Sequence, residues 1–225
     1  MKKIKLGLLG SSGRMGQEVL KAISSNFEVI FELDSKNFSQ FLKLKNKPSV
    51  DVWIDFSQPE VLKSFLKYLK LNPAPIVSGT TGLSLALEKE LEGLSKITAV
   101  FWAPNMSIGV ALVAKALEVF KGHQQYDFQI DEVHHKHKKD SPSGTALFLQ
   151  KKLDSVLGHK KTPAPLATRG GGVFGIHRIQ ALSDEEMITI EHTALNRSVF
   201  AKGALWAASQ ITKKKPGFYT MKDLI

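Results

Sequence analysis

The stretch K-I-K-L-G-L-L-G-S-S-G-R-M-G, residues 3–16, decides the fold of this chain. Residues 3–9 alternate into an apolar pattern that predicts a strand, and glycines follow at Gly10, Gly13 and Gly16. The next residues, 17–24, have the composition of a helix. A strand, a glycine-rich turn and a helix in this order suit a phosphate-binding loop, because glycines allow a close backbone approach and the helix N-terminus offers N–H groups. The spacing G-x-x-G-x-x-G differs from the commoner G-x-G-x-x-G, so an ordinary glycine turn stays open as the alternative.

Strands and helices alternate through the rest of the first half of the chain. This alternation predicts a parallel sheet with right-handed crossovers, and therefore an N-terminal Rossmann-type domain in an α/β protein. Ser57, followed three residues later by Glu60, predicts a capping box at the start of one helix. The predicted strands cover residues 27–33, 50–56, 75–78 and 97–102, and the predicted helices cover residues 60–70 and 83–94.

Polar loops follow the carboxyl ends of these strands, where ligands of parallel sheets bind. Asp34 ends the second strand about 20 residues after the glycine turn, at the place of a ribose hydroxyl acceptor. A plain aspartate at a strand end is the alternative interpretation. The glycine turn and the loops at residues 56–57, 79–81 and 103–106 share this edge. We therefore expect a nicotinamide coenzyme, NADH or NADPH, to bind there.

The second half of the chain has a different pattern. Residues 107–121 are apolar nearly all round, which predicts a helix buried on several sides, between two domains. Consecutive strand-like runs then predict an α+β domain with a mostly antiparallel or mixed sheet. We expect a dinucleotide-binding domain of residues 1–106 and 203–225, with a second domain of residues 107–202. The runs cover residues 126–133, 175–183 and 186–194, residues 196–202 are a candidate fourth strand, and residues 203–212 predict a closing helix.

Residues 168–175, T-R-G-G-G-V-F-G, predict a long flexible loop. Three successive glycines carry a high entropic cost of ordering, which argues against an idle structural role. A mobile substrate loop and a plain linker between a helix and a strand both fit this composition.

The segment E-V-H-H-K-H-K-K-D-S-P-S-G-T-A, residues 132–146, concentrates titratable side chains. His134 and His135 follow a predicted strand, and neighbours on an extended chain point in opposite directions. Lys138 is four residues after His134, so one helical turn would bring them together. A lysine charge lowers the pKa of a nearby histidine, and the pair could act as acid and base near neutral pH.

The end of the same segment predicts a helix N-terminus. Asp140 and Ser143 can cap the helix, which would leave the N–H groups of Gly144 and Thr145 to hold a carboxylate. A metal site built from histidines is less favoured, because two of them are neighbours and no carboxylate–histidine framework accompanies them. A solvated loop of histidine and lysine before a well-capped helix is the other alternative.

Composition excludes several classes of protein. The 225 residues suffice for a proper core, no cysteine is present, and no apolar run is long enough to span a membrane. The glycines at Gly7 and Gly10 make the N-terminus a poor signal peptide, so we expect a cytoplasmic protein. The net charge of +10 comes mainly from lysine, which argues against nucleic-acid binding and fits a solvated surface or the steering of an anion.

Several motifs together resemble one family of enzymes. They are G-R-M-G at 13–16, D-F-S at 55–57, G-T-T-G at 79–82, A-P-N-M-S-I-G-V at 103–110, the run Q-I-D-E-V-H from 129 to 134 with Lys138, Asp140 and P-S-G-T-A at 142–146, and F-A-K-G-A at 200–204. The resemblance is to the 4-hydroxy-tetrahydrodipicolinate (dihydrodipicolinate) reductases, and it covers the chain almost from end to end.

This resemblance implies an oxidoreductase of diaminopimelate and lysine biosynthesis that reduces a cyclic unsaturated dicarboxylate with NADH or NADPH. By position, His134 resembles the proton donor and acceptor of the family and Lys138 its second proton donor. His135, Gly144 and Thr145 resemble contacts to the substrate carboxylates. Family members are commonly homotetramers built through the sheet of the second domain. The implied coenzyme contacts are Gly10, Ser11, Ser12, Gly13, Arg14, Met15, Asp34, Gly79, Thr80, Thr81, Ala103, Pro104, Asn105 and Met106.

The sequence departs from the family pattern at three places. The segment between Asp34 and Val50 is short and rich in lysine, so we expect an element of the first domain to be missing there. Ser35 stands where members that accept NADPH often carry arginine, which favours NADH, although Lys36 could meet a 2′-phosphate. Ile176 stands where family loops often carry glutamate. The alternatives to this family are a Rossmann-type dehydrogenase for another substrate and a non-enzymatic protein that binds nucleotides or nucleic acid.

Overall fold

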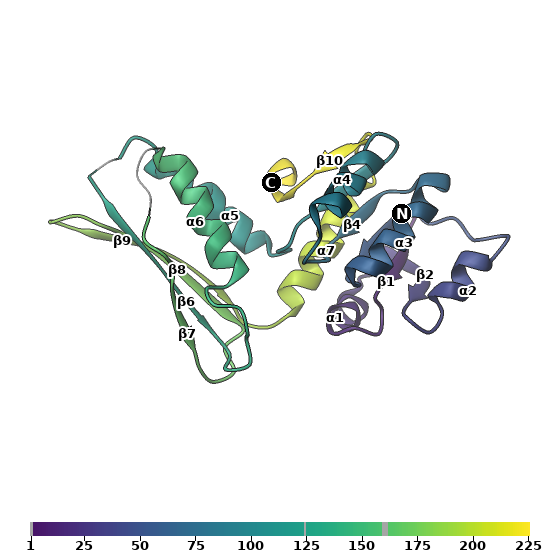
Figure 1. The fold of residues 1–225 in the computed structure, drawn as a ribbon, viewed down its shortest axis with the longest axis horizontal. Coiled ribbons are helices and arrows are strands. Elements are labelled where there is room, and N and C mark those ends of the chain that lie inside the picture. Colours follow the sequence, from purple (N-terminus) through teal and green to yellow (C-terminus); the bar gives the residue numbers. More distant parts are fainter. Residues whose placement is uncertain (1, 124, 159–161) are drawn as a thin grey trace. The chain divides into compact units, whose positions relative to one another are not determined.

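The computed structural model describes residues 2–123, 125–158 and 162–225. The chain forms two compact units, one of Met1–Met106 with Ser198–Ile225 and one of Ser107–Arg197 (Figure 1). The chain returns to the first unit at Ser198, five residues before Gly203, where the sequence predicted the boundary. The reason is that a single helix, α7 (Ser198–Ile211), begins there. The predicted strand at residues 196–202 is therefore wrong. Ala201, Ala204, Ala208 and Ile211 are buried at helical spacing, and this period overrides the local strand-like composition.

The first unit contains a six-stranded sheet in the order β10-β5-β4-β3-β1-β2, and all of its pairings are parallel. This confirms the predicted Rossmann-type sheet. The short strand β10 was not predicted and extends the sheet at one edge. The strands are β1 (Ile4–Leu9), β2 (Phe27–Leu33), β3 (Val52–Asp55), β4 (Ile76–Ser78), β5 (Ala99–Trp102) and β10 (Gly217–Tyr219).

Helices cover both faces of this sheet. Leucine and phenylalanine side chains of α3 and α4 pack with Trp53, Ile76 and Val100 of the strands, and α7, which packs beside α1, contacts the strands β3, β4 and β5. The short segment after Asp34 does contain a helix, α2, whose Phe41 contacts the rings of Trp53 and Tyr68. The helices are α1 (Arg14–Ala22), α2 (Phe38–Lys43), α3 (Pro59–Leu71), α4 (Leu85–Leu94) and α8 (Met221–Leu224).

The second unit has a four-stranded mixed sheet in the order β7-β6-β8-β9. β6 (Asp127–His134), β8 (Gly175–Leu182) and β9 (Met187–Ala194) are antiparallel, whereas β7 (Leu166–Arg169) runs parallel to β6. This confirms the predicted α+β domain with a mixed sheet. Residues 168–169 belong to β7, so the predicted loop at residues 168–175 is shorter and joins two strands instead of a helix and a strand.

One face of this sheet is covered by α5 (Ile108–Ala116), η1 (Leu117–Phe120) and α6 (Gly144–Leu157). Along β6 the inward side chains Phe128 and Ile130 enter the core, and the two that continue the same face, Glu132 and His134, are buried as well. The inward face of the strand thus changes from apolar to polar near its carboxyl end. Leu112 and Val119 are exposed, so the helical segment 107–121 is buried on several sides but part of it faces solvent.

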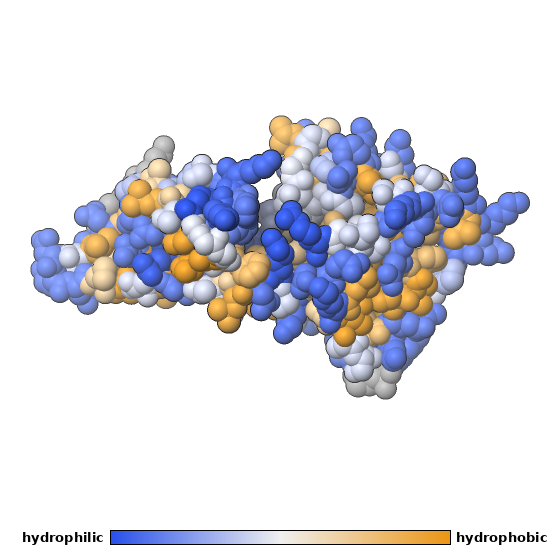
Figure 2. All heavy atoms as spheres, turned by 90° about the horizontal axis from the view of Figure 1, so that it is seen from below, coloured by the Kyte–Doolittle hydropathy of each residue, from blue (hydrophilic) through white to orange (hydrophobic). Residues whose placement is uncertain are grey.

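The surface of the described residues is mixed in character. Hydrophilic residues cover much of the face seen in Figure 2, and hydrophobic residues form separate groups on it. Among the described residues, no helix has the length and apolar character needed to cross a membrane.

Candidate active site

The loops that follow β1 and β3, which are neighbours in the first sheet, meet at the carboxyl edge of that sheet. Gly10 has φ +84°, and a Cβ atom there would lie 2.4 Å from the carbonyl oxygen of Phe56. Only glycine fits both conditions. Helix α1 begins directly after Gly13, so the first N–H groups of the helix face the loop without a capping side chain. This arrangement suits the pyrophosphate of a dinucleotide.

Asp34 closes the same edge from the end of β2. Its Oδ1 accepts a hydrogen bond from the backbone N–H of Lys36 at 2.8 Å. That bond, followed by one from the hydroxyl of Ser12, lowers the pKa of the Asp34 carboxyl. Asp34 is therefore a half-exposed, ionised acceptor tied to the glycine turn, as a ribose-binding carboxylate should be.

A second carboxylate, Asp55, is fully buried at the end of β3. Its Oδ1 accepts from the hydroxyl of Ser57 at 2.5 Å, and its Oδ2 accepts from the hydroxyls of Ser78 at 2.6 Å and Thr80 at 2.8 Å. Burial raises the pKa of Asp55, and the hydroxyl hydrogen bonds offset this only in part. The predicted capping box at Ser57 is wrong: Gln58 is the N-cap of α3, and the Ser57 hydroxyl turns to Asp55 instead.

Of the fourteen residues expected to contact the coenzyme, Arg14 and Met15 lie in the first turn of α1 and the others lie in the loops after the strands, and they differ in exposure. Position 79 requires glycine, because a Cβ atom there would lie 2.3 Å from the ring of Phe56. Ser12, Gly13, Arg14, Thr81 and Pro104 are exposed; Gly10, Met15, Asp34, Gly79 and Asn105 are partly buried; Ser11, Thr80, Ala103 and Met106 are buried.

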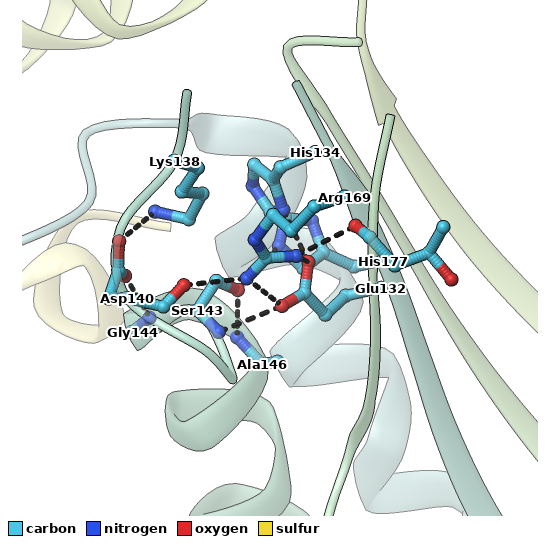
Figure 3. A network of polar contacts seen from close by, with 10 residues as sticks. Glu132, His134, Lys138, Asp140, Ser143, Gly144, Ala146, Arg169 and His177 are labelled. Atoms are coloured by element: carbon cyan, nitrogen blue, oxygen red, sulfur yellow. Dashed lines mark hydrogen bonds and ion pairs between the residues drawn. The ribbon is translucent and has the colours of Figure 1, made fainter. Parts of the chain in front are cut away.

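The second unit contains a cluster of charged side chains around Glu132, which is fully buried (Figure 3). Arg169 donates to both of its oxygens, from Nη2 to Oε1 at 2.7 Å and from Nη1 to Oε2 at 2.9 Å. The backbone N–H of Ser143 donates to Oε1 at 2.9 Å, and Oε2 also forms a short hydrogen bond with Nδ1 of His134. The carboxylate is thus held by a guanidinium, an imidazole and an amide at once.

These contacts set the protonation states. Burial alone would raise the pKa of Glu132, but the hydrogen bonds from Arg169, His134 and the Ser143 N–H outweigh it and hold the pKa below its ordinary value. Burial lowers the pKa of His134, Glu132 opposes that change, and the charges of Lys138 and Arg169 lower the pKa further. The predicted effect of Lys138 on His134 is confirmed in direction, although burial contributes more.

Lys138 and the start of α6 meet at Asp140. The Lys138 ammonium lies 2.8 Å from Oδ1 of Asp140, and the N–H of Gly144 points to Oδ2 at 3.4 Å. The hydroxyl of Ser143 caps α6 by accepting from the N–H of Ala146, as predicted. His134 ends β6, and residues 135–138 form a tight turn in which the Lys138 N–H donates to the carbonyl of His135 at 3.0 Å, so no helical turn joins His134 to Lys138. A carboxylate therefore already occupies the place that the sequence predicted for a substrate carboxylate.

His135 is on the opposite side of the chain from His134 and is partly exposed. Its backbone N–H donates to the carbonyl of Val173 at 2.6 Å, and its buried Nδ1 has no partner among the described residues. Thr145 lies in the first turn of α6 and is partly exposed. Within the part of the chain that the structure describes, no three His, Asp or Glu side chains converge as metal ligands would.

Three residues of the cluster were not predicted from the sequence as site residues: Arg169, His177 and His192. His177 on β8 lies opposite Glu132 in the strand register, and His192 on β9 lies opposite His177. Each is a polar residue at an inward position of a strand whose other inward residues are mostly apolar, as Glu132 is on β6. This break in the pattern could have identified them from the sequence. Burial lowers the pKa of His177 to about 4.

The comparison with protein families decides the assignment. The family model described as "Dihydrodipicolinate reductase, N-terminus" matches residues 4–106, and the one described as "Dihydrodipicolinate reductase, C-terminus" matches residues 106–225. The chain belongs to the dihydrodipicolinate reductase family. The resemblance found in the sequence is thereby confirmed, and the two matched segments meet at Met106, the last residue of the N-terminal segment of the first unit.

Relatives in this family are similar over their full length. A protein named 4-hydroxy-tetrahydrodipicolinate reductase from Bdellovibrio bacteriovorus is 49% identical, with 100% of this chain and 97% of the relative covered. One of the same name from Rickettsia rickettsii is 38% identical, with 98% of each chain covered. The solved structure of a dipicolinate-bound dihydrodipicolinate reductase from Paenisporosarcina sp. TG-14 has a TM-score of 0.77 at 22% identity, covers 99% of each chain, and so supports the fold.

Proposed function

We propose that this dihydrodipicolinate reductase family member reduces 4-hydroxy-tetrahydrodipicolinate to tetrahydrodipicolinate in diaminopimelate and lysine biosynthesis. Full-length relatives carry that name, and the residues of the family signature are present. The observation that carries the proposal is the cluster in the second unit, where buried His134 adjoins a lysine and a helix N-terminus. It offers a proton source beside groups that attract a carboxylate.

The coenzyme is NADH or NADPH, and the residues at the first sheet fit it. Gly10 and Gly13 would hold the pyrophosphate at the start of α1, and Asp34 would accept hydrogen bonds from ribose hydroxyls. The coenzyme supplies the hydride when bound, and the protein supplies orientation and charge. We propose a preference for NADH, because ionised Asp34 would repel a 2′-phosphate and Ser35 offers no compensating guanidinium. Lys36 could meet a 2′-phosphate, which would reduce the preference for NADH over NADPH.

His134 and Lys138 are proposed as the two groups that exchange protons with the substrate. His134 is neutral at physiological pH because its pKa is lowered, so it can accept a proton and return it. Lys138 is partly exposed, with 21% of its side chain accessible, and it pairs with Asp140, so its side chain can bind a carboxylate or donate a proton. His135 and the N–H groups of Gly144 and Thr145 would then hold the carboxylates of the substrate, which would displace Asp140 from the helix N-terminus.

We further propose a cytoplasmic homotetramer that assembles through the sheet of the second unit. Leu166 of β7 and Met187 of β9 expose apolar side chains, 61% and 58% accessible respectively, on strands at the two edges of that sheet. Burying such residues against other copies of the chain would remove apolar surface from water. Analytical ultracentrifugation tests this: a monomer at micromolar concentration would contradict the proposal.

The activity is tested with the condensation product of aspartate semialdehyde and pyruvate as acceptor, following the oxidation of NADH and NADPH by absorbance. We expect turnover with both coenzymes and a higher kcat/KM with NADH. His134→Gln and Lys138→Ala should each lower kcat by about 100-fold or more while coenzyme binding is kept. Lys96→Ala, far from the cluster in sequence and in the first unit, serves as the control. Turnover of an unrelated substrate instead would assign the chain to another dehydrogenase activity.

A further inference from the structure

Glu132 occupies a position where the fold calls for an apolar side chain. It continues the inward face of β6 after Phe128 and Ile130, and it is 0% exposed. Removing a carboxylate from water is expensive, and hydrogen-bonded cations offset that cost only when the geometry is good. A buried ion pair of this kind is a poor device for stability alone, because a well-packed apolar side chain serves at least as well. The buried charge of Glu132 therefore indicates a function other than stability.

The hydrogen bonds show that the charge of Glu132 acts on His134. Glu132 bonds to Nδ1 of His134, so in the neutral imidazole the proton is kept on Nδ1 and the lone pair is on Nε2. Nε2 is the nitrogen left to exchange a proton. A Cβ atom at residue 175 would lie 2.9 Å from Nε2, so glycine at that position keeps this nitrogen uncovered. Two different strands, β6 and β8, thus contribute to the same result.

Glu132 is itself held in place. Arg169 donates hydrogen bonds to both carboxylate oxygens of Glu132, and the N–H of Ser143, at the start of α6, donates to one of them. The same Nη2 of Arg169 donates to the backbone carbonyl of Asp140 at 2.6 Å, so one guanidinium fixes both the carboxylate and the segment that carries Lys138. A planar fork makes these contacts together, which the single ammonium of lysine cannot do.

We propose that Glu132, fixed by Arg169, is the positioning residue of His134: it sets the tautomer and the ring orientation that leave Nε2 to exchange the proton. The inference rests on the proposed function for the role of His134. The charged and titratable groups that face His134 are Glu132 on β6, Lys138 after β6, Arg169 at the end of β7 and His177 on β8. Of these, Glu132 favours the imidazolium, so its charge keeps His134 basic enough to accept a proton despite burial.

The decisive variant is Glu132→Gln, which keeps the shape and removes the charge. We expect kcat to fall by about 10- to 100-fold with KM for the coenzyme unchanged, as when a carboxylate that orients a histidine is lost. The acid limb of the pH–rate profile should move to lower pH, because His134 loses the group that stabilises its protonated form. Glu118→Gln, which removes an exposed carboxylate from an ion pair with Lys152 in the same unit, should change neither quantity.

A direct readout does not depend on turnover. Long-range ¹H–¹⁵N spectra of the histidine rings, with His134 assigned from His134→Gln, should show the neutral Nδ1–H tautomer in the unmodified protein and a mixture of tautomers in Glu132→Gln. An Nε2–H tautomer in the unmodified protein would overturn the proposal. If Glu132→Gln does not fold, Arg169→Lys tests the fixing of Glu132 instead, since it retains the positive charge and loses the fork. We expect a lower kcat and a mixture of His134 tautomers, and an unchanged kcat and tautomer would refute the role of Arg169.

The two proposals fail in different ways. If His134→Gln turns over normally, the proposed role of His134 is wrong, whatever the tautomer. If His134→Gln is inactive while folded Glu132→Gln keeps the unmodified kcat, pH profile and tautomer, the reductase assignment stands and the positioning role of Glu132 is refuted.

Discussion

The two units each bury one carboxylate completely at the carboxyl end of a strand, and the two carboxylates are treated in opposite ways. Asp55 in the first unit receives hydrogen bonds from neutral hydroxyl groups, and burial raises its pKa. Glu132 in the second unit receives them from Arg169 and His134, and its pKa is lowered. The partners, and not the degree of burial, decide whether a buried acid stays ionised.

This difference separates two tasks. At Asp55 the donors Ser57, Ser78 and Thr80 follow the ends of β3 and β4, so the carboxyl group connects the loops at the edge where we propose that the coenzyme binds. At Glu132 the donors include the guanidinium of Arg169, which keeps the carboxylate charged beside the titratable ring of His134. A neutral side chain of the same shape should therefore be tolerated at Asp55 far better than at Glu132.

The largest expected difference is in stability. Glu132→Ala leaves the Arg169 guanidinium, 18% exposed, without its carboxylate, and should lower the free energy of unfolding by about 3–5 kcal/mol. Asp55→Ala leaves hydroxyls that can rotate to other partners, and should cost about 1–3 kcal/mol. Urea denaturation of both variants at pH 7 measures the two values. Equal losses would show that the hydroxyl and cation partners are equivalent.

How much of this could be read from the sequence depends on the range of the interactions. The strands β1 to β5 and the glycine turn follow from local patterns of apolar residues and glycine, and the cap at Ser143 follows from its neighbours. The strands β7 and β10 were not predicted, and their pairing with strands distant in the chain, β6 and β5, defines them.

The polar cluster illustrates the limit more clearly. Its histidine and lysine lie in one dense segment and were predicted as a site. Arg169 is 37 positions from Glu132 in the chain, and the sequence shows it only as the start of a glycine loop. His177 meets Glu132 through strand register, which depends on turn geometry and packing and not on local composition. The orientation of His134 was therefore beyond sequence reasoning.

The second expected difference is in the response to acid. The pKa of His177 is about 4 in the folded protein against an ordinary value of about 6.5, so the unfolded chain takes up a proton first as the pH falls. The second unit should lose stability between pH 6.5 and 4, by on the order of 3 kcal/mol from this group. Asp55 has the opposite sign: its raised pKa favours the folded state as the pH falls.

Hydrogen exchange followed by mass spectrometry, corrected for intrinsic rates, should therefore show acid-induced loss of protection in β6 and β8 with little change in β3 and β4. His177→Asn should flatten the response of the second unit. Uniform loss of protection in both sheets would show that His177 and Asp55 do not respond to acid in opposite ways.

A smaller effect is expected on coenzyme binding. Asp55→Asn retains one acceptor oxygen and the shape of the side chain, so the loop at Thr80 should loosen and the Kd for NADH should rise by about 2- to 10-fold, the equivalent of one weakened hydrogen bond. Glu132→Gln should leave the Kd unchanged, because its contacts lie within the second unit. Isothermal titration calorimetry with NADH compares them. A change at Glu132 as large as that at Asp55 would break the separation of tasks.

The smallest effect concerns the helix caps of the two units. Ser84 caps α4 in the first unit and Ser143 caps α6 in the second, each by accepting an N–H three residues on. Ser84→Ala should cost about 1 kcal/mol of stability and leave activity unchanged. Ser143→Ala should cost a similar amount, but the start of α6 also supplies the N–H that holds Glu132, so kcat should fall as well. Unfolding curves and kcat measured on both variants test this, and unchanged kcat in Ser143→Ala would show that the Glu132 contacts survive without the cap.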